Sequence, residues 1–536
     1  MIDRLTAKLL KSREALRKPE IWLLILILIA FAIRFGSIDF QSLWRDEVDA
    51  IRFGRDLSAE IDAALLGGGA GSMIDKLRDI LTRPGFNGPL YFLTLERWSR
   101  AAGDTGFALR AFSALFGILT IPLIYALAKR LFRAAHIDLL AAWLMTISAY
   151  FVWYSQEAKM YTEITALALA AVYGLRRAVD TPAGQRAWPW WLLTIAATTL
   201  AMYSHILAAL LIGVEVVLFL LWWPAAKQHW KGGLISLAAL TLPYLPLALW
   251  QIGLALTPGD QGHTFYRFDE IVRVLMTGFT NGILPFDAAL NAVNIRSQVG
   301  DVTSAISPAG WGAWLLSVLT IIGALMWKGR GDRADRLGLV AWALLPVAAI
   351  AIVSLNRPVF TDRYLIWIGP AVYLLAALGT AELWKWRRIA GGAALAVLSM
   401  VAMLGLYAQA SIPFKSDFRS AARFVQQHYQ GDEIVVFQIP YGRYIFDYYF
   451  EPAFRSSDGP YTNQRNPDGS FAQDAASIDA GIANALSGQK AAWLVATEVE
   501  MWDERHLLEE WLKRNARETD RGEFMRVSVV RYDLTP

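Results

Sequence analysis

Long apolar segments are the feature that most limits what this chain can fold into. A helix needs roughly 20 mostly apolar residues to cross the hydrocarbon core of a bilayer. Eleven segments approach that requirement, near 20–38, 107–131, 137–154, 160–176, 189–204, 206–223, 232–253, 310–327, 337–355, 364–383 and 389–408. Only 18% of the 536 residues are charged, whereas a soluble domain carries roughly 25%. The sequence therefore predicts a polytopic α-helical membrane protein with about 11 transmembrane helices.

Composition and missing motifs exclude several classes of protein. The chain contains no Cys, which removes disulfide frameworks, thiolate metal sites and cysteine nucleophiles. Its formal net charge of +4 is small for its length and does not indicate a nucleic-acid partner. There is no Walker A loop, H-E-x-x-H or G-x-S-x-G sequence. We therefore expect neither a metal site nor a cofactor.

The Lys and Arg residues beside the apolar segments predict the topology. Alternate connections are rich in them, as is the N-terminus: Lys129, Arg130, Arg133, Arg176, Arg177, Arg186, Lys227, Lys231, Lys328, Arg330, Arg333, Arg336, Lys385, Arg387 and Arg388. The short connections between these hold only Lys159, Arg357 and Arg363. Because basic loops stay in the cytoplasm, we expect a cytoplasmic N-terminus and an extracytoplasmic C-terminal domain, in an inner or plasma membrane.

Three polar segments are predicted on the extracytoplasmic side. Loops 39–106 and 254–309 interrupt a membrane domain at 1–408, and the stretch SMIDKLRDILTRPG at 72–85 is typical of a short interfacial helix. Residues 409–536 alternate between helical patterns (DFRSAARFVQQHY, GRYIFDYYF, RHLLEEWLKRNA) and strand patterns (EIVVFQ, AAWLVATEV, FMRVSVVRYDL). This alternation predicts a small α/β domain.

Two adjacent acids, Asp46 and Glu47, follow the first apolar segment in SLWRDEVDA. Carboxylates next to a membrane are costly unless they are paired or used. One interpretation is a solvated loop in which Arg45 and Arg52 balance the acids. The other is a general base that accepts a proton from an acceptor hydroxyl as a new bond forms.

Basic residues also occur in short connections on the same predicted side. Glu157 and Lys159 lie in the turn SQEAKMY, and His205 lies in the turn YSHI. A lysine at such a position can simply extend toward water, and a lone histidine is commonly structural. A lysine on this turn can otherwise bind a phosphate as a point charge.

Arg363 and Tyr364 begin the tenth apolar segment in NRPVFTDRYL. An arginine at the end of a span is commonly an interfacial anchor, and the alternative is a bidentate phosphate clamp. We expect the charged groups of Lys159 and Arg363 within about 15 Å of each other, so that both reach one phosphate.

These elements, in order, resemble those of the C-type (GT-C fold) membrane glycosyltransferases. SLWRDEVDA resembles the Asp-Glu element of their first outer loop, and residues 87–132 resemble their second-span region in the protein-mannosyltransferase and aminoarabinose-transferase-like superfamily. The turn SQEAKMY resembles the family's SQEARMY-type turn, and DRYLIWIGPAVYLLAA resembles its late Arg-Tyr span. The stretch SDFRSAARFVQQHYQGDEIVVF resembles the start of the outer domain in many bacterial members.

The resemblance implies a GT-C fold, a polyprenyl-phosphate-linked sugar as donor, and a glycan, lipid or protein acceptor in the cell envelope. Asp46 is then the general base of an inverting transfer and Glu47 positions the acceptor or the loop. Arg45, Glu157, Lys159, His205, Arg363 and Tyr364 are the implied substrate-binding residues, with the two cations neutralising the leaving phosphate. The chain departs from the family pattern at two places. Asn87-Gly88-Pro89 replaces the usual His-Pro-Pro, so no role of that histidine applies here, and Lys159 replaces the commoner arginine, which weakens the case for a bidentate phosphate contact there.

Other functions are compatible with the same pattern. A transporter or flippase for a lipid-linked sugar would share the spans and the phosphate-binding cations, but would show internal repeats, which the sequence lacks. A ligase that moves a whole glycan and an inactive receptor that binds partners through 409–536 are further alternatives. The intact Asp-Glu pair argues against the receptor.

Overall fold

The computed structural model describes residues 18–66, 88–132, 136–245, 264–282, 308–326 and 330–534. The chain forms two compact units, a helical unit of residues 1–38 and 54–411 and a C-terminal unit of residues 39–53 and 412–536. The C-terminal unit therefore includes the start of the first polar loop in addition to the predicted domain. The predicted interfacial helix at 72–85 lies outside the described residues.

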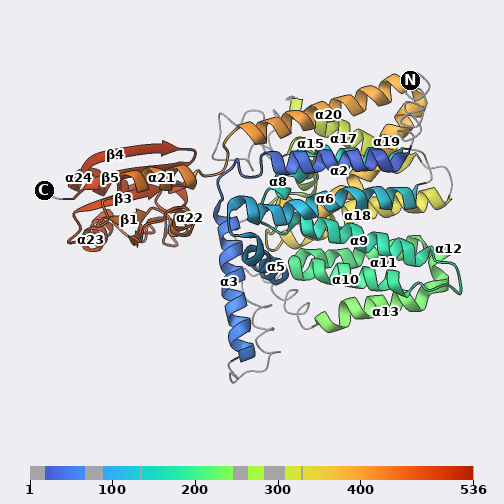
Figure 1. Cartoon of the computed structure of the whole chain (residues 1–536), viewed down its shortest axis with the longest axis horizontal. Helices are drawn as coiled ribbons and strands as arrows, with labels where there is room; N and C mark the ends of the chain where they lie inside the picture. Colours follow the sequence, from blue (N-terminus) through green and yellow to red (C-terminus); the bar gives the residue numbers. More distant parts are fainter. Residues whose placement is uncertain are drawn as a thin grey trace, which may run out of the picture. The chain divides into compact units, whose positions relative to one another are not determined.

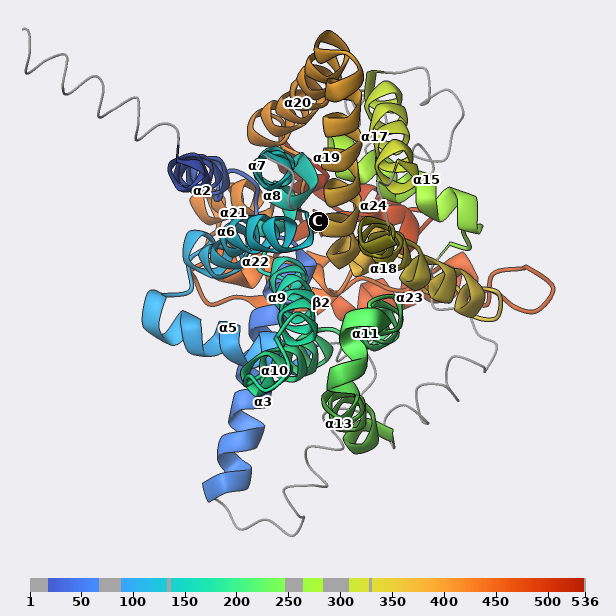
Figure 2. The same ribbon diagram turned by 90° about the vertical axis from the view of Figure 1, so that its right-hand side faces the viewer.

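The helical unit is a bundle whose members run side by side (Figure 1), and several of them are seen nearly end-on in Figure 2. Its main helices are α2 (Pro19–Gly36), α5 (Pro89–Ala102), α6 (Gly106–Leu131), α7 (Ile137–Ile147), α8 (Ala149–Ser155), α9 (Tyr161–Val179), α10 (Trp188–Ser204), η1 (Ile206–Ala209), α11 (Leu210–Leu221), α12 (Trp223–Ala226), α13 (Trp230–Thr241), α15 (Phe268–Asn281), α17 (Pro308–Leu325), α18 (Arg330–Ser354), η5 (Asp362–Ile368), α19 (Gly369–Trp386) and α20 (Arg388–Ser411). Helix α3 (Arg45–Leu66) begins in the C-terminal unit.

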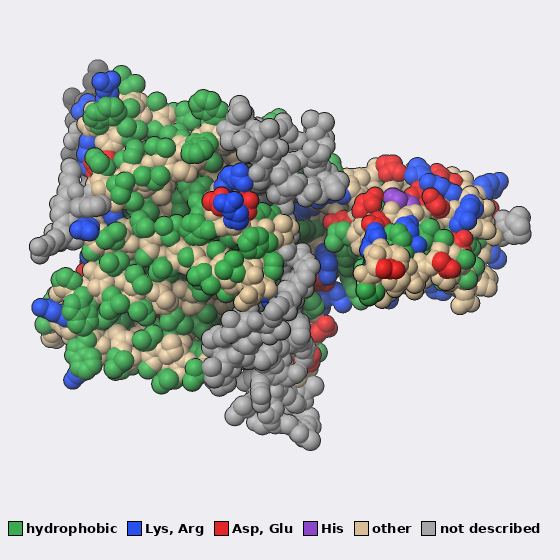
Figure 3. Space-filling model, turned by 180° about the vertical axis from the view of Figure 1, so that it is seen from behind, with side chains coloured by type: hydrophobic (Ala, Val, Ile, Leu, Met, Phe, Trp, Pro, Cys, Tyr) green, Lys and Arg blue, Asp and Glu red, His purple; other side chains and the backbone are tan. Residues whose placement is uncertain are grey.

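The described helices agree with a membrane protein. Five are long and apolar enough to cross a bilayer, or up to seven if each of two bent pairs is one span, among the residues that the structure describes. Helix α10 has only 17 residues, and α9 carries Glu163 and Arg176 near its ends. The predicted number of eleven spans stays a prediction. Figure 3 shows one face of this unit, on which hydrophobic side chains predominate.

A buried arginine stabilises the break between α7 and α8, where the helix axis bends by 58°. Arg34 is fully buried and donates hydrogen bonds to the carbonyl oxygens of Met145 and Thr146, at 3.2 and 3.1 Å, and to Ser155 Oγ at 3.2 Å. Carbonyl groups released by a helix break need such partners, because lipid offers none. Gly117 makes room for this arrangement, since a Cβ there would lie 2.1 Å from Ser155 Oγ.

The C-terminal unit is a five-stranded sheet with helices on both faces. Its elements are α21 (Phe418–His428), β1 (Ile434–Phe437), α22 (Gly442–Tyr449), β2 (Arg455–Asp458), α23 (Ala475–Ala485), β3 (Ala491–Ala496), α24 (Leu507–Asn515), β4 (Arg517–Phe524) and β5 (Val527–Asp533). The strand order is β2-β1-β3-β5-β4, with β1 parallel to β2 and β3, and with β5 antiparallel to β3 and β4. Apolar residues of β1 and β3 pack against α23 and α24 on one face. The predicted α/β domain is thus present as a small sheet.

Three elements of this unit are not evident in the sequence. β2 (RSSD) and β4 (RETDRGEF) are polar edge strands with largely exposed side chains, so neither has the apolar alternation of a core strand. Helix α23 is rich in small residues and follows a loop rich in Gly, Asn and Asp. The surface of this unit mixes acidic and basic side chains in Figure 3, as expected for a domain in water.

Candidate functional site

The turn between α8 and α9 buries both of its charged residues. Glu157 is 1% and Lys159 9% exposed, although a lysine that only extends toward water would be largely exposed. The backbone holds the turn: Lys159 N–H donates to Glu157 O at 2.7 Å, and Ser113 Oγ donates to Lys159 O at 3.0 Å. The ammonium group lies 5.3 Å from the centre of the Phe92 ring. Lys159 is therefore held in a packed, hydrogen-bonded turn and does not lie in a solvated loop.

Arg363 and Tyr364 lie in the first turn of η5, which packs against α9. Tyr154 of α8 fixes the start of this turn by donating its hydroxyl to Asp362 Oδ2 at 3.1 Å. The Arg363 guanidinium lies 6.0 Å from the centre of the Tyr161 ring, which begins α9. Segments about 200 positions apart in the chain are thus joined at one end of the bundle.

His205 lies where α10 ends and η1 begins, and its side chain is 2% exposed. Its ring is 4.9 Å from that of Tyr364. Nδ1 accepts the backbone N–H of Leu207 at 3.3 Å, so the proton of a neutral ring is on Nε2. Nε2 is buried and has no hydrogen-bond partner among the described residues. A hydrogen-bond donor without a partner is therefore held inside the protein.

His205 lies close enough to both predicted cations, Lys159 and Arg363, for their charges to act on its ring. Burial, and then the positive charges of Arg363 and Lys159, lower the pKa of His205 to about 4. The imidazole is accordingly neutral at physiological pH, and both cations are close enough to act on it. The structure thus brings together Lys159, His205, Arg363 and Tyr364, with Glu157 in the same turn as Lys159. We call Lys159, His205 and Arg363 the basic cluster.

A glycine also shapes this region. A Cβ at Gly88 would lie 2.2 Å from Ser204 O and 2.8 Å from Met160 Cε, so no larger residue fits without displacing backbone. Gly88 belongs to the Asn-Gly-Pro sequence that departs from the family pattern, while Asn87 lies outside the described residues. Sequence reasoning did not single out Tyr154 or Gly88, because nothing in a single sequence shows which turns they approach.

The predicted acids lie in the C-terminal unit, in the first turn of α3. Asp46 is half-buried there. Arg45 does not balance it as the solvated-loop interpretation supposed, because Arg45 Nε is 3.6 Å from Asp49 Oδ2 and its guanidinium stacks over the Tyr441 ring at 4.7 Å. Arg52 also pairs with Asp49, at 2.9 Å.

Glu47 is fully buried, and its carboxylate accepts from the ammonium group of Lys415 at 3.0 Å. Of the two roles expected for Glu47, positioning of the loop agrees with this burial and with the pair to Lys415. Lys415 was not singled out in the sequence. No signal marks it, because its partner is 368 positions away.

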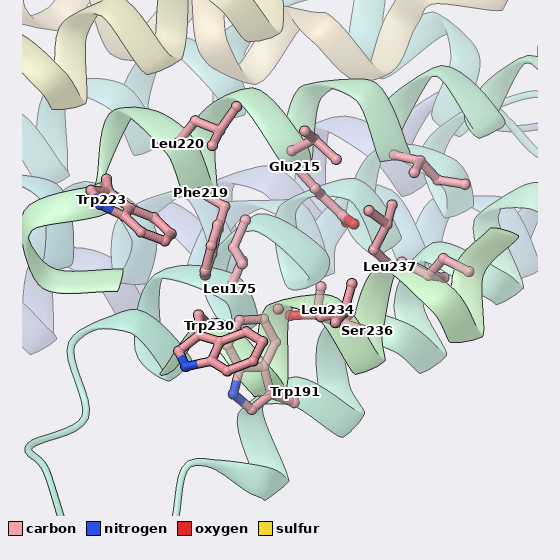
Figure 4. A pocket seen from close by; sticks show the side chains of 15 residues that line it. Leu175, Trp191, Glu215, Phe219, Leu220, Trp223, Trp230, Leu234, Ser236 and Leu237 are labelled. Atoms are coloured by element: carbon pink, nitrogen blue, oxygen red, sulfur yellow. The ribbon is translucent and has the colours of Figure 1, made fainter. Parts of the chain in front are cut away.

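A separate cavity of about 290 Å³ lies between α10, α11 and α13. Its walls are almost entirely apolar, with Trp191, Phe219 and Trp230 among them, and Figure 4 shows Glu215 extending from α11 toward Leu237 of α13. The Glu215 carboxylate accepts the Thr198 hydroxyl at 2.5 Å. None of the predicted site residues lines this cavity. No group of three or more His, Asp or Glu that could hold a metal occurs within the described ranges.

Part of the chain matches a known protein family. Residues 86–250 match the family model described as dolichyl-phosphate-mannose-protein mannosyltransferase. This stretch includes the Lys159 turn and His205. None of the curated proteins gives a sequence match to the chain.

Solved structures with the same fold cover nearly the whole chain. ArnT from Cupriavidus metallidurans, bound to undecaprenyl phosphate, has a TM-score of 0.56 at 12% identity, covering 95% of this chain and 98% of that protein. The oligosaccharyltransferase of Archaeoglobus fulgidus tethered to an acceptor peptide has a TM-score of 0.53 at 13% identity, covering 91% and 70%. At these identities the likeness concerns the fold. The resemblance noted in the sequence is confirmed by both kinds of comparison, and the chain is a membrane protein with the fold of the C-type glycosyltransferases.

Proposed function

We propose that this protein is a membrane glycosyltransferase that moves a sugar from a polyprenyl-phosphate-linked donor to an acceptor hydroxyl at the extracytoplasmic face of the membrane. The observation that carries the proposal is the basic cluster: the buried Lys159, the half-buried Arg363 and a buried, neutral imidazole donor lie close together. Like charges repel, so this arrangement is favourable when an anion joins it. A phosphate supplies the negative charge and accepts hydrogen bonds from all three groups.

The chemistry of the donor explains why such a cluster is useful. In the transfer, the acceptor oxygen bonds to the anomeric carbon while the bond from that carbon to the phosphate oxygen breaks. The electron pair of the broken bond stays on the lipid phosphate, so negative charge grows there in the transition state. Fixed cations stabilise that charge, and Lys159 and Arg363 would hold the departing phosphate. His205 would donate its Nε2 proton in a hydrogen bond while remaining neutral.

The acceptor must lose a proton as it attacks. Asp46 would take that proton as general base, and the single displacement would invert the anomeric centre. The half-buried position of Asp46 in the first turn of α3 supports this role, because it leaves part of the side chain accessible to an acceptor. Polyprenyl phosphate as the carrier agrees with the undecaprenyl phosphate bound to ArnT. The acceptor hydroxyl would belong to a glycan, a lipid or a protein.

The test is sugar transfer from a polyprenyl-phosphate-linked donor by the purified full-length protein. Asp46→Asn keeps the size of the side chain but cannot act as a carboxylate base, so we expect transfer to fall by about 10²–10⁴-fold. Asp49→Asn, the same substitution one turn further along α3, is the matched control and should keep most of the activity. Near-normal transfer by the Asp46→Asn protein would remove Asp46 from the mechanism. A lipid-linked-sugar transporter, by contrast, would move donor across vesicles without transferring sugar at all.

A further inference from the structure

The segment 39–53 is attached to the C-terminal domain by its side chains. Gln41 spans the start of that domain: its Nε2 donates to Ile412 O at 2.8 Å, and its Oε1 accepts from the backbone N–H groups of Phe414 and Lys415 at 2.9 and 3.2 Å. Both polar atoms of the Gln41 side chain thus hydrogen-bond to the backbone of the same short stretch, residues 412–415. The segment is therefore held at a defined register along the domain.

Further contacts fix the residues between Gln41 and the acids. Arg419 of α21 donates to the backbone oxygen of Asp39 at 3.0 Å and to its Oδ1 at 2.9 Å. The hydroxyl of Tyr449, from α22, accepts the backbone N–H of Leu43 at 2.7 Å, and the Leu43 side chain is fully buried. These bonds hold the chain up to the residue before Trp44.

The last contact reaches the reactive turn itself. Lys415 Nζ lies 3.0 Å from Glu47 Oε2, and the two side chains are 4% and 0% exposed. The ammonium group also lies 5.2 Å from the centre of the Trp44 ring. A buried ion pair gives little net stability, because both charges must leave water. What it does provide is one defined geometry, and here that geometry belongs to the residue next to Asp46.

We infer that Lys415 is a positioning residue: by holding Glu47, it fixes the first turn of α3 and with it the carboxylate of Asp46. This inference rests on the proposed function, in which Asp46 is the base. It also assigns a task to the C-terminal domain, which is to hold the reactive loop in place.

The ion pair also has an electrostatic consequence for the base. With Lys415 present, the charge of Glu47 is balanced and does not oppose ionisation of its neighbour. Other charged and titratable groups surround this segment. They are Asp39 within it, Arg45, Asp49 and Arg52 on α3, and Arg419, Tyr441, Tyr444, Tyr449, Glu498 and Arg526 from the C-terminal domain. Replacing Lys415 by an uncharged residue leaves Glu47 as a second negative charge beside Asp46.

The first experiment measures attachment without relying on activity. Because the chain has no Cys, a Leu43→Cys background reports access to the buried segment through its rate of maleimide labelling. Lys415→Met should raise that rate by about 10-fold or more, whereas Lys490→Met, which removes an exposed lysine of the same domain, should leave it unchanged. Equal labelling in all three proteins would contradict attachment by Lys415.

The second experiment measures the pH dependence of transfer. Lys415→Met should move the acidic limb of the pH–rate profile to higher pH by about one unit. The double variant Lys415→Met/Glu47→Gln removes both charges and should bring the limb back. A limb that does not move in Lys415→Met would overturn the positioning role. If instead Asp46→Asn retains transfer, the proposed base is wrong, while the labelling result stands on its own.

Discussion

Two groups of buried charges, one in each unit, differ in the sign of the charges that they bring together. In the C-terminal unit opposite charges meet: Lys415 binds Glu47. Arg531 likewise donates to Glu433, which also accepts the indole N–H of Trp493 at 2.7 Å. In the helical unit Lys159 and Arg363 both act on the neutral ring of His205 and lower its pKa. The first arrangement pairs opposite charges, whereas the second places two cations around one neutral ring, where the proposed function puts a phosphate. Under the proposed function, the first group of charges holds the fold and the second binds the phosphate of the donor.

Removing a cation from the C-terminal unit should have the largest effect on stability. Arg531→Met would leave the carboxylate of Glu433 buried without its charge partner, which costs about 3–5 kcal/mol in the free energy of unfolding. Arg455, whose pair with Asp432 is exposed, provides the control, and Arg455→Met should cost less than about 1 kcal/mol. Chemical denaturation of the purified protein measures both, and equal effects would contradict the distinction between the two pairs.

The same kind of substitution in the basic cluster should act on binding instead. Lys159→Met or Arg363→Met removes one cation from the basic cluster, so we expect the binding of a polyprenyl phosphate to weaken by about 10–100-fold. Arg387→Met, an equal change of charge at an exposed residue after α19, should leave binding unchanged. The cluster would not be a phosphate site if all three variants bound with the affinity of the wild type.

His205 should contribute less, and in a way that depends on hydrogen bonding and not on charge. His205→Gln keeps a neutral donor near the position of Nε2 and should weaken binding less than His205→Asn, for which we expect about 5–10-fold, the value of one hydrogen bond. Calorimetric titration with a polyprenyl alkyl phosphate, a phosphodiester whose single negative charge is constant between about pH 5 and pH 8, makes the comparison. A larger effect of Gln than of Asn would contradict the donor role.

The pKa of His205 gives this prediction a pH signature. Because burial and the two cations hold it at about 4, binding should be flat between about pH 8 and pH 5. A histidine with the ordinary pKa of about 6.5 would gain charge below that pH and bind the anion more tightly. The unfolded chain takes up this proton near pH 6.5 and the folded chain only near pH 4. Stability should therefore fall as the pH drops through that window.

The smallest effect is expected in the cavity of the helical unit. Glu215→Gln keeps a side-chain oxygen that can accept the Thr198 hydroxyl, so the free energy of unfolding should change by less than about 1 kcal/mol. Thr198→Val removes the donor and should cost about 1 kcal/mol or more. Unfolding in detergent distinguishes them. A large effect of Glu215→Gln would mean that the charge of Glu215 matters and that this carboxyl belongs with the functional groups.

Much of the fold could be predicted because it follows from local chemistry. Apolar segments long enough to cross a bilayer must form helices, since lipid cannot satisfy exposed backbone groups. The elements of the C-terminal unit that alternate or carry an apolar face, such as β1, β3 and α21, were recognised for the same reason. The polar edge strands β2 and β4 were not, because their side chains lack the pattern of burial and their backbone pairing is set by neighbours.

The candidate site likewise has features that follow from local sequence and features that only tertiary packing decides. The sequence by itself determined which charged residues lie beside or between apolar segments, and therefore that Asp46, Lys159, His205 and Arg363 were candidates. Only the tertiary structure decided that His205 is a neutral donor near two cations, and that Glu47 is bound by Lys415. The physical reason is distance along the chain: hydropathy is a local property, whereas the partner of a buried charge is chosen by packing between segments hundreds of residues apart.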